Sequence, residues 1–338
     1  MTAQQFEHAR VLLCRLQDSV RDALIAVRDE QTVGELSEIA EVTAADTIYR
    51  IDKVSEAAIV AWFAAYWPAE WPVELVMEGA EGGDAHTFPH GTPVSQTKFK
   101  CILDPIDGTR GLMYDKRSAW MLAGLAPQLG AQTRLSDIRV AAMTELPTSK
   151  QWAADQISGV RGCGPEGLVA ERVDVRGGGR SRLTIRPSQA TDFRHGFASL
   201  ARFFPEGKAL LAQVEEGLWD ALYGLGQNVS PLVFEDQYIS TGGQIYELLI
   251  GHDRMVADLR PLAFRKIGYS SALVCHPYDI CTEMLLREAG GVVEAPDRQP
   301  LDAPLDTTSP VAWIGFANDH LAETVGPVLK RLIAEYFE

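Results

Sequence analysis

The stretch Asp104-Pro105-Ile106-Asp107-Gly108-Thr109 is the most informative part of this 338-residue sequence. It follows an apolar run at residues 99–103, which predicts a buried strand. Two carboxylates three positions apart therefore stand where that strand ends, and the proline fixes the turn between them. Carboxylate oxygens are preferred ligands of Mg²⁺, above all when a phosphate completes the octahedron. The N–H groups of Gly108 and Thr109 and the Thr109 hydroxyl could hold that phosphate. The structural alternative is a capped turn in which Asp107 only accepts hydrogen bonds from backbone N–H groups.

Three further acidic residues stand at the ends of predicted elements. Glu78 follows a predicted strand, Asp52 opens a predicted helix, and Asp279 opens a predicted helix over residues 279–289. Each has a plain structural interpretation as well, because Asp52 and Asp279 could cap their helices and Glu78 could be a solvated loop acid. The helix dipole stabilises an aspartate at a helix N-terminus by about 0.3–1 kcal/mol. Position alone therefore does not separate a cap from a metal ligand.

Taken in order, these motifs resemble the signatures of the inositol monophosphatase superfamily, which also contains fructose-1,6-bisphosphatases and 3′(2′),5′-bisphosphate nucleotidases. The string 104–109 resembles the first signature. The string His276-Pro277-Tyr278-Asp279-Ile280-Cys281, continued by Arg287-Glu288-Ala289-Gly290-Gly291, is similar to the second. Glu78 and Asp52 stand where the family has a metal-binding glutamate and a water-positioning aspartate. The resemblance covers about residues 5–330.

The resemblance implies an α/β fold, namely a layered α-β-α-β-α sandwich of the inositol monophosphatase and fructose-1,6-bisphosphatase type. It also implies a single phosphatase domain over residues 1–338. The N-terminal lobe, about residues 1–190, would carry the metal site. The C-terminal lobe, about residues 191–338, would carry Asp279 and the elements that select the substrate.

The roles that the resemblance implies are those of a Mg²⁺-dependent phosphatase with two or three ions, which Mn²⁺ can replace. The first ion would be held by Glu78, Asp104 and the Ile106 carbonyl, and the second by Asp104, Asp107 and Asp279. Asp52 and Thr109, together with Glu78, would orient and deprotonate the attacking water. Phosphate and substrate would contact Asp107, Gly108, Thr109, Gly242 and Gly243.

Several departures from the family pattern leave the substrate open. Gly79 follows Glu78 where a second acid is common, and Glu81 is a candidate replacement. The string Arg110-Gly111-Leu112 resembles the nucleotidase and histidinol-phosphatase branches. Asp258 is a candidate for the acid that the family uses shortly before the second signature.

Inositol monophosphate is the leading substrate. The alternatives are 3′(2′),5′-bisphosphate nucleotidase, fructose-1,6-bisphosphatase and histidinol-phosphatase activity. A further alternative is a catalytically idle homologue that binds a metabolite or a partner.

Composition and charge restrict the remaining possibilities. Lys and Arg number 31 against 46 Asp and Glu, giving a formal net charge of −15, which argues against a nucleic-acid partner. The longest apolar run, residues 57–67, is shorter than the about 20 residues that cross a bilayer. No signal-peptide pattern opens the chain, and five cysteines without a CxxC pair indicate reduced thiols. We therefore expect a cytoplasmic protein, and the resemblance adds lithium sensitivity and a homodimer.

Apolar periodicity predicts a mixture of helices and strands without a strict βαβ alternation. The predicted helices cover residues 6–27, 52–67, 207–223, 244–250, 279–289 and 320–337. The predicted strands cover residues 73–77, 99–103, 119–125, 138–143, 151–154, 168–175, 183–185, 256–258, 272–274, 292–293 and 311–316.

Two other motifs point to different enzyme classes and are set aside. The GxGxxG string at residues 162–167 is interrupted by Pro165 and followed by a strand-like run, which favours a hairpin turn over a nucleotide-binding loop. Pro105 stands where the DxDGT motif of aspartyl-phosphate phosphatases needs its first aspartate, so that nucleophilic pair is absent.

Overall fold

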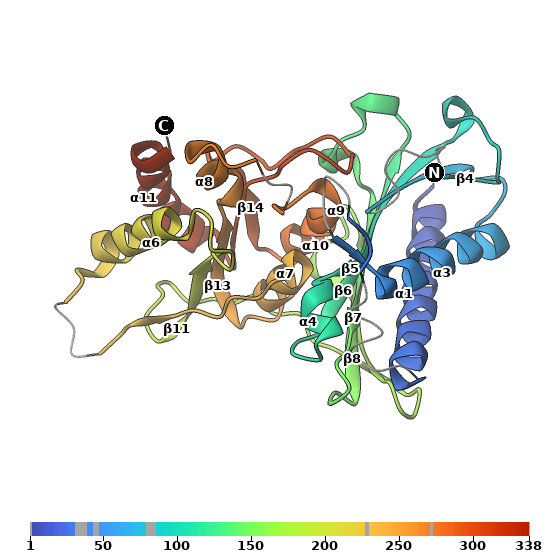
Figure 1. The fold of residues 1–338 in the computed structure, drawn as a ribbon, viewed down its shortest axis with the longest axis horizontal. Helices are drawn as coiled ribbons and strands as arrows, with labels where there is room; N and C mark the ends of the chain where they lie inside the picture. Colours follow the sequence, from blue (N-terminus) through green and yellow to red (C-terminus); the bar gives the residue numbers. More distant parts are fainter. Residues whose placement is uncertain are drawn as a thin grey trace.

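The computed structural model describes residues 2–30, 39–42, 47–78, 86–226, 230–270 and 273–337. Figure 1 shows two β-sheets, with helices outside the first sheet, between the two sheets and outside the second. These five layers are those of the predicted α-β-α-β-α sandwich, so the predicted fold class is confirmed.

The first sheet has eight strands in the order β10-β9-β8-β7-β6-β5-β3-β4, and all neighbouring pairs except β3 and β5 are antiparallel. The strands are β3 (Val73–Met77), β4 (His86–Phe88), β5 (Phe99–Asp107), β6 (Ala119–Pro127), β7 (Val140–Leu146), β8 (Ala153–Val160), β9 (Val169–Asp174) and β10 (Arg180–Arg182). Every residue of β5 is buried, because helices cover both faces of the sheet at this strand.

The parallel pair β3 and β5 is important for the position of the acidic residues. The pairing ends with Met77 opposite Leu103. Parallel strands run toward the same edge of a sheet, so the residues that come next, Glu78 and Asp104, stand beside each other at that edge.

Helices α1 (Ala3–Glu30) and α3 (Arg50–Tyr66) cover the outer face of the first sheet. The buried side of α1 recurs at three or four residues, as expected for one face of a helix, and consists of Ala9, Leu13, Leu16, Val20 and Leu24. A two-stranded hairpin, β1 (Ile39–Val42) with β2 (Thr47–Tyr49), lies between the two helices in sequence. No helix in the described ranges is long and apolar enough to cross a bilayer.

The second sheet has five strands in the order β12-β11-β13-β15-β14. They are β11 (Gly196–Leu200), β12 (Val233–Phe234), β13 (Asp253–Asp258), β14 (Val292–Glu294) and β15 (Trp313–Phe316). Helices α6 (Lys208–Tyr223), α8 (Arg260–Lys266) and α11 (Asp319–Phe337) lie outside it.

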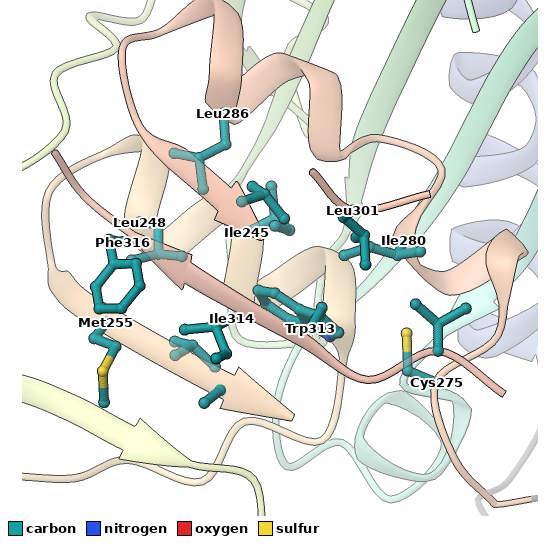
Figure 2. Close-up of a cluster of buried hydrophobic side chains, with 14 of the residues drawn as sticks. Ile245, Leu248, Met255, Cys275, Ile280, Leu286, Leu301, Trp313, Ile314 and Phe316 are labelled. Carbon is teal, nitrogen blue, oxygen red and sulfur yellow. The ribbon is translucent and has the colours of Figure 1, made fainter. Parts of the chain in front are cut away.

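The middle layer fills the space between the two sheets. It consists of α4 (Thr109–Met113), α7 (Thr241–Leu249), α9 (Pro277–Ile280) and α10 (Glu283–Glu288). Figure 2 shows Ile245 and Leu248 of α7 beside Trp313, Ile314 and Phe316 of β15 in one buried hydrophobic cluster. This packing fixes α7 between the two sheets, and its N-terminus lies against the end of β5.

Two of the predicted elements are wrong. The helix predicted over 279–289 is broken into α9 and α10 at Cys281 and Thr282. Cys281 packs there so closely against Gly124 of β6 that a Cβ on that glycine would meet the Cys281 carbonyl oxygen at 3.2 Å.

The strand predicted at residues 183–185 instead lies at β10, because Asp174 accepts N–H bonds from Arg176 and Gly177 and tightens the turn that precedes it. The predicted strand 272–274 lies partly outside the described residues, and Val274 is not in a strand. The hairpin interpretation of residues 162–167 is confirmed, since they connect antiparallel β8 and β9 through the short helix α5 (Gly164–Gly167).

Candidate active site

The end of β5 is irregular, and this irregularity positions two carboxylates. Asp104 pairs with Leu122 of β6 and Asp107 with Trp120, so three steps along β5 match two along β6. This is a β-bulge, which suits Pro105 because proline has no N–H to donate to a ladder. The Ile106 N–H turns back to Asp104 and donates to its Oδ1 at 2.9 Å.

Three carboxylates meet at this bulge although they are far apart in sequence. One oxygen from each of Asp104, Asp107 and Asp279 lies within 4.8 Å of the others. Asp104 and Asp107 are buried, at 1% and 6% exposure. Asp279 comes from the single turn of α9, and its Oδ2 accepts the His276 N–H.

The electrostatics of the cluster are unfavourable for three ionised carboxylates. Burial raises the pKa of Asp104 well above its ordinary value, and the charges of Glu78, Asp107 and Asp279 raise it further. Burial and the charge of Asp107 raise the pKa of Asp279 in the same way. Burial also raises the pKa of Asp107, to about 6, against the lowering effect of its hydrogen bonds.

This chemistry fits a divalent cation. Within the ranges that the structure describes, no Lys or Arg nitrogen lies within salt-bridge distance of Asp104, Asp107 or Asp279, while the imidazole Nδ1 of His276 lies 3.8 Å from Asp279 Oδ2. Buried carboxylates without a cationic partner are costly unless they coordinate a metal. Clustered carboxylate oxygens are the donor set of Mg²⁺ and Mn²⁺ rather than of the softer metals.

Glu78 and the Ile106 carbonyl lie on the same cavity as the three carboxylates. Glu78 lines it directly, and its charge acts on Asp104. The Ile106 carbonyl accepts the Thr109 hydroxyl at 2.8 Å and keeps a second lone pair. Glu81, the candidate for the second acid, lies outside the described residues.

Asp52 and Thr109 meet across 57 positions of sequence. The Thr109 Oγ1 lies 3.2 Å from Asp52 Oδ1 and 2.8 Å from the Ile106 carbonyl oxygen. Helix α3 begins at Arg50, so Asp52 lies in its first turn and is not the N-cap that the alternative interpretation assumed. The hydroxyl of Thr109 is thus in a position to link a carboxylate to the end of β5.

The N-terminus of α7 holds Asp107, and this arrangement was not predicted. The Ser240 hydroxyl donates to Asp107 Oδ2 at 2.8 Å and accepts the Gly243 N–H at 2.8 Å. The N–H groups of Thr241 and Gly242 also donate to the Asp107 carboxylate. A serine directly before the first residue of a helix is a common N-cap. The second partner of the Ser240 hydroxyl, Asp107, lies 133 positions away in the sequence.

Glycine is required where the chain passes close to Asp107. A Cβ on Gly242 would lie 2.5 Å from Leu122 Cδ2 and 3.0 Å from Asp107 Oδ2. A Cβ on Gly243 would lie 2.3 Å from the Tyr238 ring. Neither glycine lines the cavity, so their contact with a substrate stays a prediction.

Gly108 also sits where a side chain is disfavoured. Its φ of +98° lies in the left-handed region, and a Cβ would lie 3.0 Å from the Ile239 carbonyl oxygen.

The cavity has a volume of about 90 Å³, and part of its wall is not acidic. Phe203, Phe204 and Arg260 line it together with the carboxylates. Asp258, the candidate for the acid that the family uses shortly before the second signature, is fully buried and binds Arg260 instead of lining the cavity. That expectation for Asp258 is therefore wrong, because the guanidinium of Arg260, two positions later, pairs with its carboxylate.

No protein-family profile and no curated protein matches the sequence. Solved structures do match over nearly the whole chain. The extragenic suppressor protein suhB from Bartonella henselae aligns with a TM-score of 0.63 at 15% identity, covering 96% of this chain and 99% of that one. The inositol monophosphatase from Anabaena gives 0.58 at 15% identity over 98% and 97% of the two chains.

Fructose-1,6-bisphosphatase from Leishmania major aligns with a TM-score of 0.63 at 15% identity, over 96% of this chain and 93% of that one. At these identities the likeness shows the fold. The chain has the two-sheet α/β fold of the inositol monophosphatase and fructose-1,6-bisphosphatase structures, as the sequence motifs implied.

Proposed function

We propose that this protein is a Mg²⁺-dependent phosphomonoesterase that hydrolyses a small phosphorylated metabolite with an activated water. The observation that carries the proposal is the meeting of Asp104, Asp107 and Asp279 within 4.8 Å, in a cavity where no Lys or Arg of the described residues pairs with them. The shared fold of solved phosphatases supports it.

The residues that would hold the ions are Glu78, Asp104, the Ile106 carbonyl, Asp107 and Asp279, with two or three Mg²⁺ ions or Mn²⁺ in their place. When bound, such ions lower the pKa of a coordinated water and stabilise negative charge on phosphoryl oxygens. The bulge in β5 and the α7 N-terminus keep the ligand oxygens in place before any ion arrives, because each buried carboxylate already accepts a backbone N–H bond.

Asp52 and Thr109 are proposed to move the proton of the attacking water. The water would donate to Thr109 Oγ1 while the Thr109 hydroxyl proton passes to Asp52 Oδ1, which lies 3.2 Å away. General-base assistance of this kind contributes about 100- to 10,000-fold in rate. The backbone N–H groups of Gly108 and Thr109 are proposed to bind phosphate oxygens, and Gly242 and Gly243 to border the rest of the substrate.

Inositol monophosphate is the substrate that the sequence resemblance suggests first, followed by a bisphosphate nucleotide, a sugar bisphosphate or histidinol phosphate. Lithium sensitivity, a homodimer and a cytoplasmic location are proposed on the same ground. We also propose that one domain contains both lobes, with residues 1–190 carrying most of the metal ligands and residues 191–338 contributing Asp279.

The test is release of inorganic phosphate from these four substrates, with Mg²⁺ and with excess chelator. We expect release that requires Mg²⁺ and is abolished in Asp104→Asn, while Asp22→Asn, an exposed site on α1, retains full activity. Mg²⁺ binding by calorimetry without turnover of any substrate would instead identify a catalytically idle protein.

A further inference from the structure

The non-acidic part of the cavity wall contains a buried arginine. The Arg260 side chain is only 8% exposed, yet it lines the cavity. Its guanidinium lies 4.4 Å from the centre of the Phe203 ring and 5.4 Å from that of Phe204. Cation–π contacts of this kind stabilise a guanidinium beside aromatic rings, so Phe203 and Phe204 favour this position of the Arg260 side chain.

The hydrogen bonds of Arg260 to the described residues do not use all of its N–H donors. Its Nε donates to Asp258 Oδ1 at 2.9 Å, its Nη2 donates to Asp258 Oδ2, and its Nη1 donates to the Leu273 carbonyl at 3.1 Å. A guanidinium has five N–H groups, so one on each Nη has no acceptor among the residues that the structure describes. Buried donors require an acceptor, and these two belong to a side chain that lines the cavity.

Asp258 is not available to accept hydrogen bonds from the hydroxyl groups of a neutral polyol, because its buried carboxylate is bound to Arg260. What Arg260 adds to the wall is a positive charge with unused N–H donors, and such donors suit the oxygens of a phosphate or carboxylate. The same charge acts on Asp107 and Asp279, so it is close to the proposed site of hydrolysis.

We propose that Arg260 binds a second anionic group of the substrate, so that the preferred substrates are phosphate monoesters with a further phosphate or carboxylate, and not inositol monophosphate. This inference rests on the proposed phosphatase function and names its substrate class. Arg260 then determines specificity and Asp258 positions it, while Phe203 and Phe204 favour this position of its side chain.

The first experiment compares kcat/KM of the wild-type protein with Mg²⁺ across three charge classes. Fructose 1,6-bisphosphate, adenosine 3′,5′-bisphosphate and 3-phosphoglycerate carry a second anion, inositol 1-phosphate is neutral away from its ester, and histidinol phosphate is cationic there. Hydrogen bonds to charged groups correspond to about 10- to 100-fold in binding. We expect at least one doubly anionic substrate to exceed inositol 1-phosphate by that factor and histidinol phosphate to be the poorest.

The second experiment changes the arginine. Asp258→Asn combined with Arg260→Gln removes both charges, so that no lone buried charge is left. We expect the ratio of kcat/KM between the best doubly anionic substrate and inositol 1-phosphate to fall about 10- to 100-fold, mainly through KM. Arg260→Lys, which keeps the charge but loses the fork, should give an intermediate ratio and serves if the double variant does not fold. Arg265→Gln, an exposed arginine on the same helix, should leave the ratio unchanged.

The outcomes separate the two proposals. If inositol 1-phosphate is hydrolysed as well as every doubly anionic substrate, or if the ratio survives the loss of Arg260, the specificity inference is wrong and the phosphatase function stands. If no substrate releases phosphate, the proposed function itself fails.

Discussion

Replacing Asp104 by asparagine should stabilise the metal-free protein while it abolishes activity. The substitution is nearly isosteric, and the amide oxygen can still accept the Ile106 N–H that now lies 2.9 Å from Oδ1. What disappears is one negative charge in a buried cluster whose oxygens lie within 4.8 Å of one another. The proposed metal site accounts for this cluster in the wild-type protein, and the variant keeps two of its three carboxylates.

The size of the gain follows from the raised pKa of Asp104. The folded pKa of the Asp104 carboxyl group lies above its ordinary value of about 3.9. The group therefore does not oppose folding below pH 3.9, and it lowers the free energy of unfolding as the pH rises from 3.9 to the folded pKa. The loss is about 1.4 kcal/mol per pH unit, so its ceiling is about 4 kcal/mol at pH 7 and about 1.5 kcal/mol at pH 5. Direct repulsion gives a similar size, because two charges 4.8 Å apart at an effective dielectric constant of about 20 repel by about 3.5 kcal/mol.

Thermal unfolding in chelator and in Mg²⁺ measures both effects. At roughly 1.4 °C per kcal/mol for 338 residues, Asp104→Asn should raise Tm in chelator by up to about 6 °C at pH 7 and by up to about 2 °C at pH 5. Mg²⁺ at about 100 times its Kd should add about 2.7 kcal/mol to the wild-type protein and little to the variant. Asp155→Asn is the control, because Asp155 is paired with Arg172 at 2.8 Å and its loss should lower Tm without changing the Mg²⁺ response.

Two results would refute this reasoning. One is an Asp104→Asn protein that is no more stable than wild type in chelator at pH 7. The other is a gain that is equal at pH 5 and pH 7, since an effect of ionisation must grow over that interval.

Three further predictions concern Gly242, Thr109 and Asp253. Gly242→Ala should lower the free energy of unfolding by about 1–3 kcal/mol in urea titrations, because a Cβ at this position has no space. Gly179→Ala is the control and should be neutral, since no atom lies within 4 Å of a Cβ there. Equal stability of the two variants would contradict the packing around Gly242. Thr109→Val should reduce kcat about 100-fold or more at unchanged Tm while Thr109→Ser retains most of it, and an active valine variant would remove Thr109 from the proton path. Burial and two neighbouring carboxylates raise the pKa of Asp253 to about 7. The free energy of unfolding of Asp253→Asn should therefore equal that of the wild type at pH 4 and exceed it by about 2–4 kcal/mol at pH 8. A constant difference in this free energy from pH 4 to pH 8 would show that Asp253 does not titrate in that range.

Local sequence signals predicted much of the site. The string around Asp104 and Asp107 predicted the end of a strand and a turn, because proline and glycine favour a turn locally. The bulge was not predicted, since it is defined by the pairing of β5 with β6. Glu78 and Asp279 stand next to predicted elements, and the resemblance to the family signatures, not their position alone, singled them out as metal ligands. The structure brings Asp104, Asp107 and Asp279 together, and it places Asp52 beside Thr109.

The features that sequence reasoning missed depend on tertiary packing. Ser240 is recognisable as an N-cap, but only the fold shows that its hydroxyl also reaches Asp107. Asp258 was interpreted as a free acid because the sequence does not show that the Arg260 side chain turns back onto it. The break between α9 and α10 lies where Cys281 packs closely against Gly124 of β6, a contact that the local sequence does not show.

The most direct test of the metal site is anomalous diffraction from crystals soaked in Mn²⁺. We predict a peak bounded by the carboxylates of Asp104, Asp107 and Asp279, which is lost in Asp104→Asn crystals soaked in the same way. An ordered cluster without any peak, at a Mn²⁺ concentration that saturates phosphate release, would contradict the account.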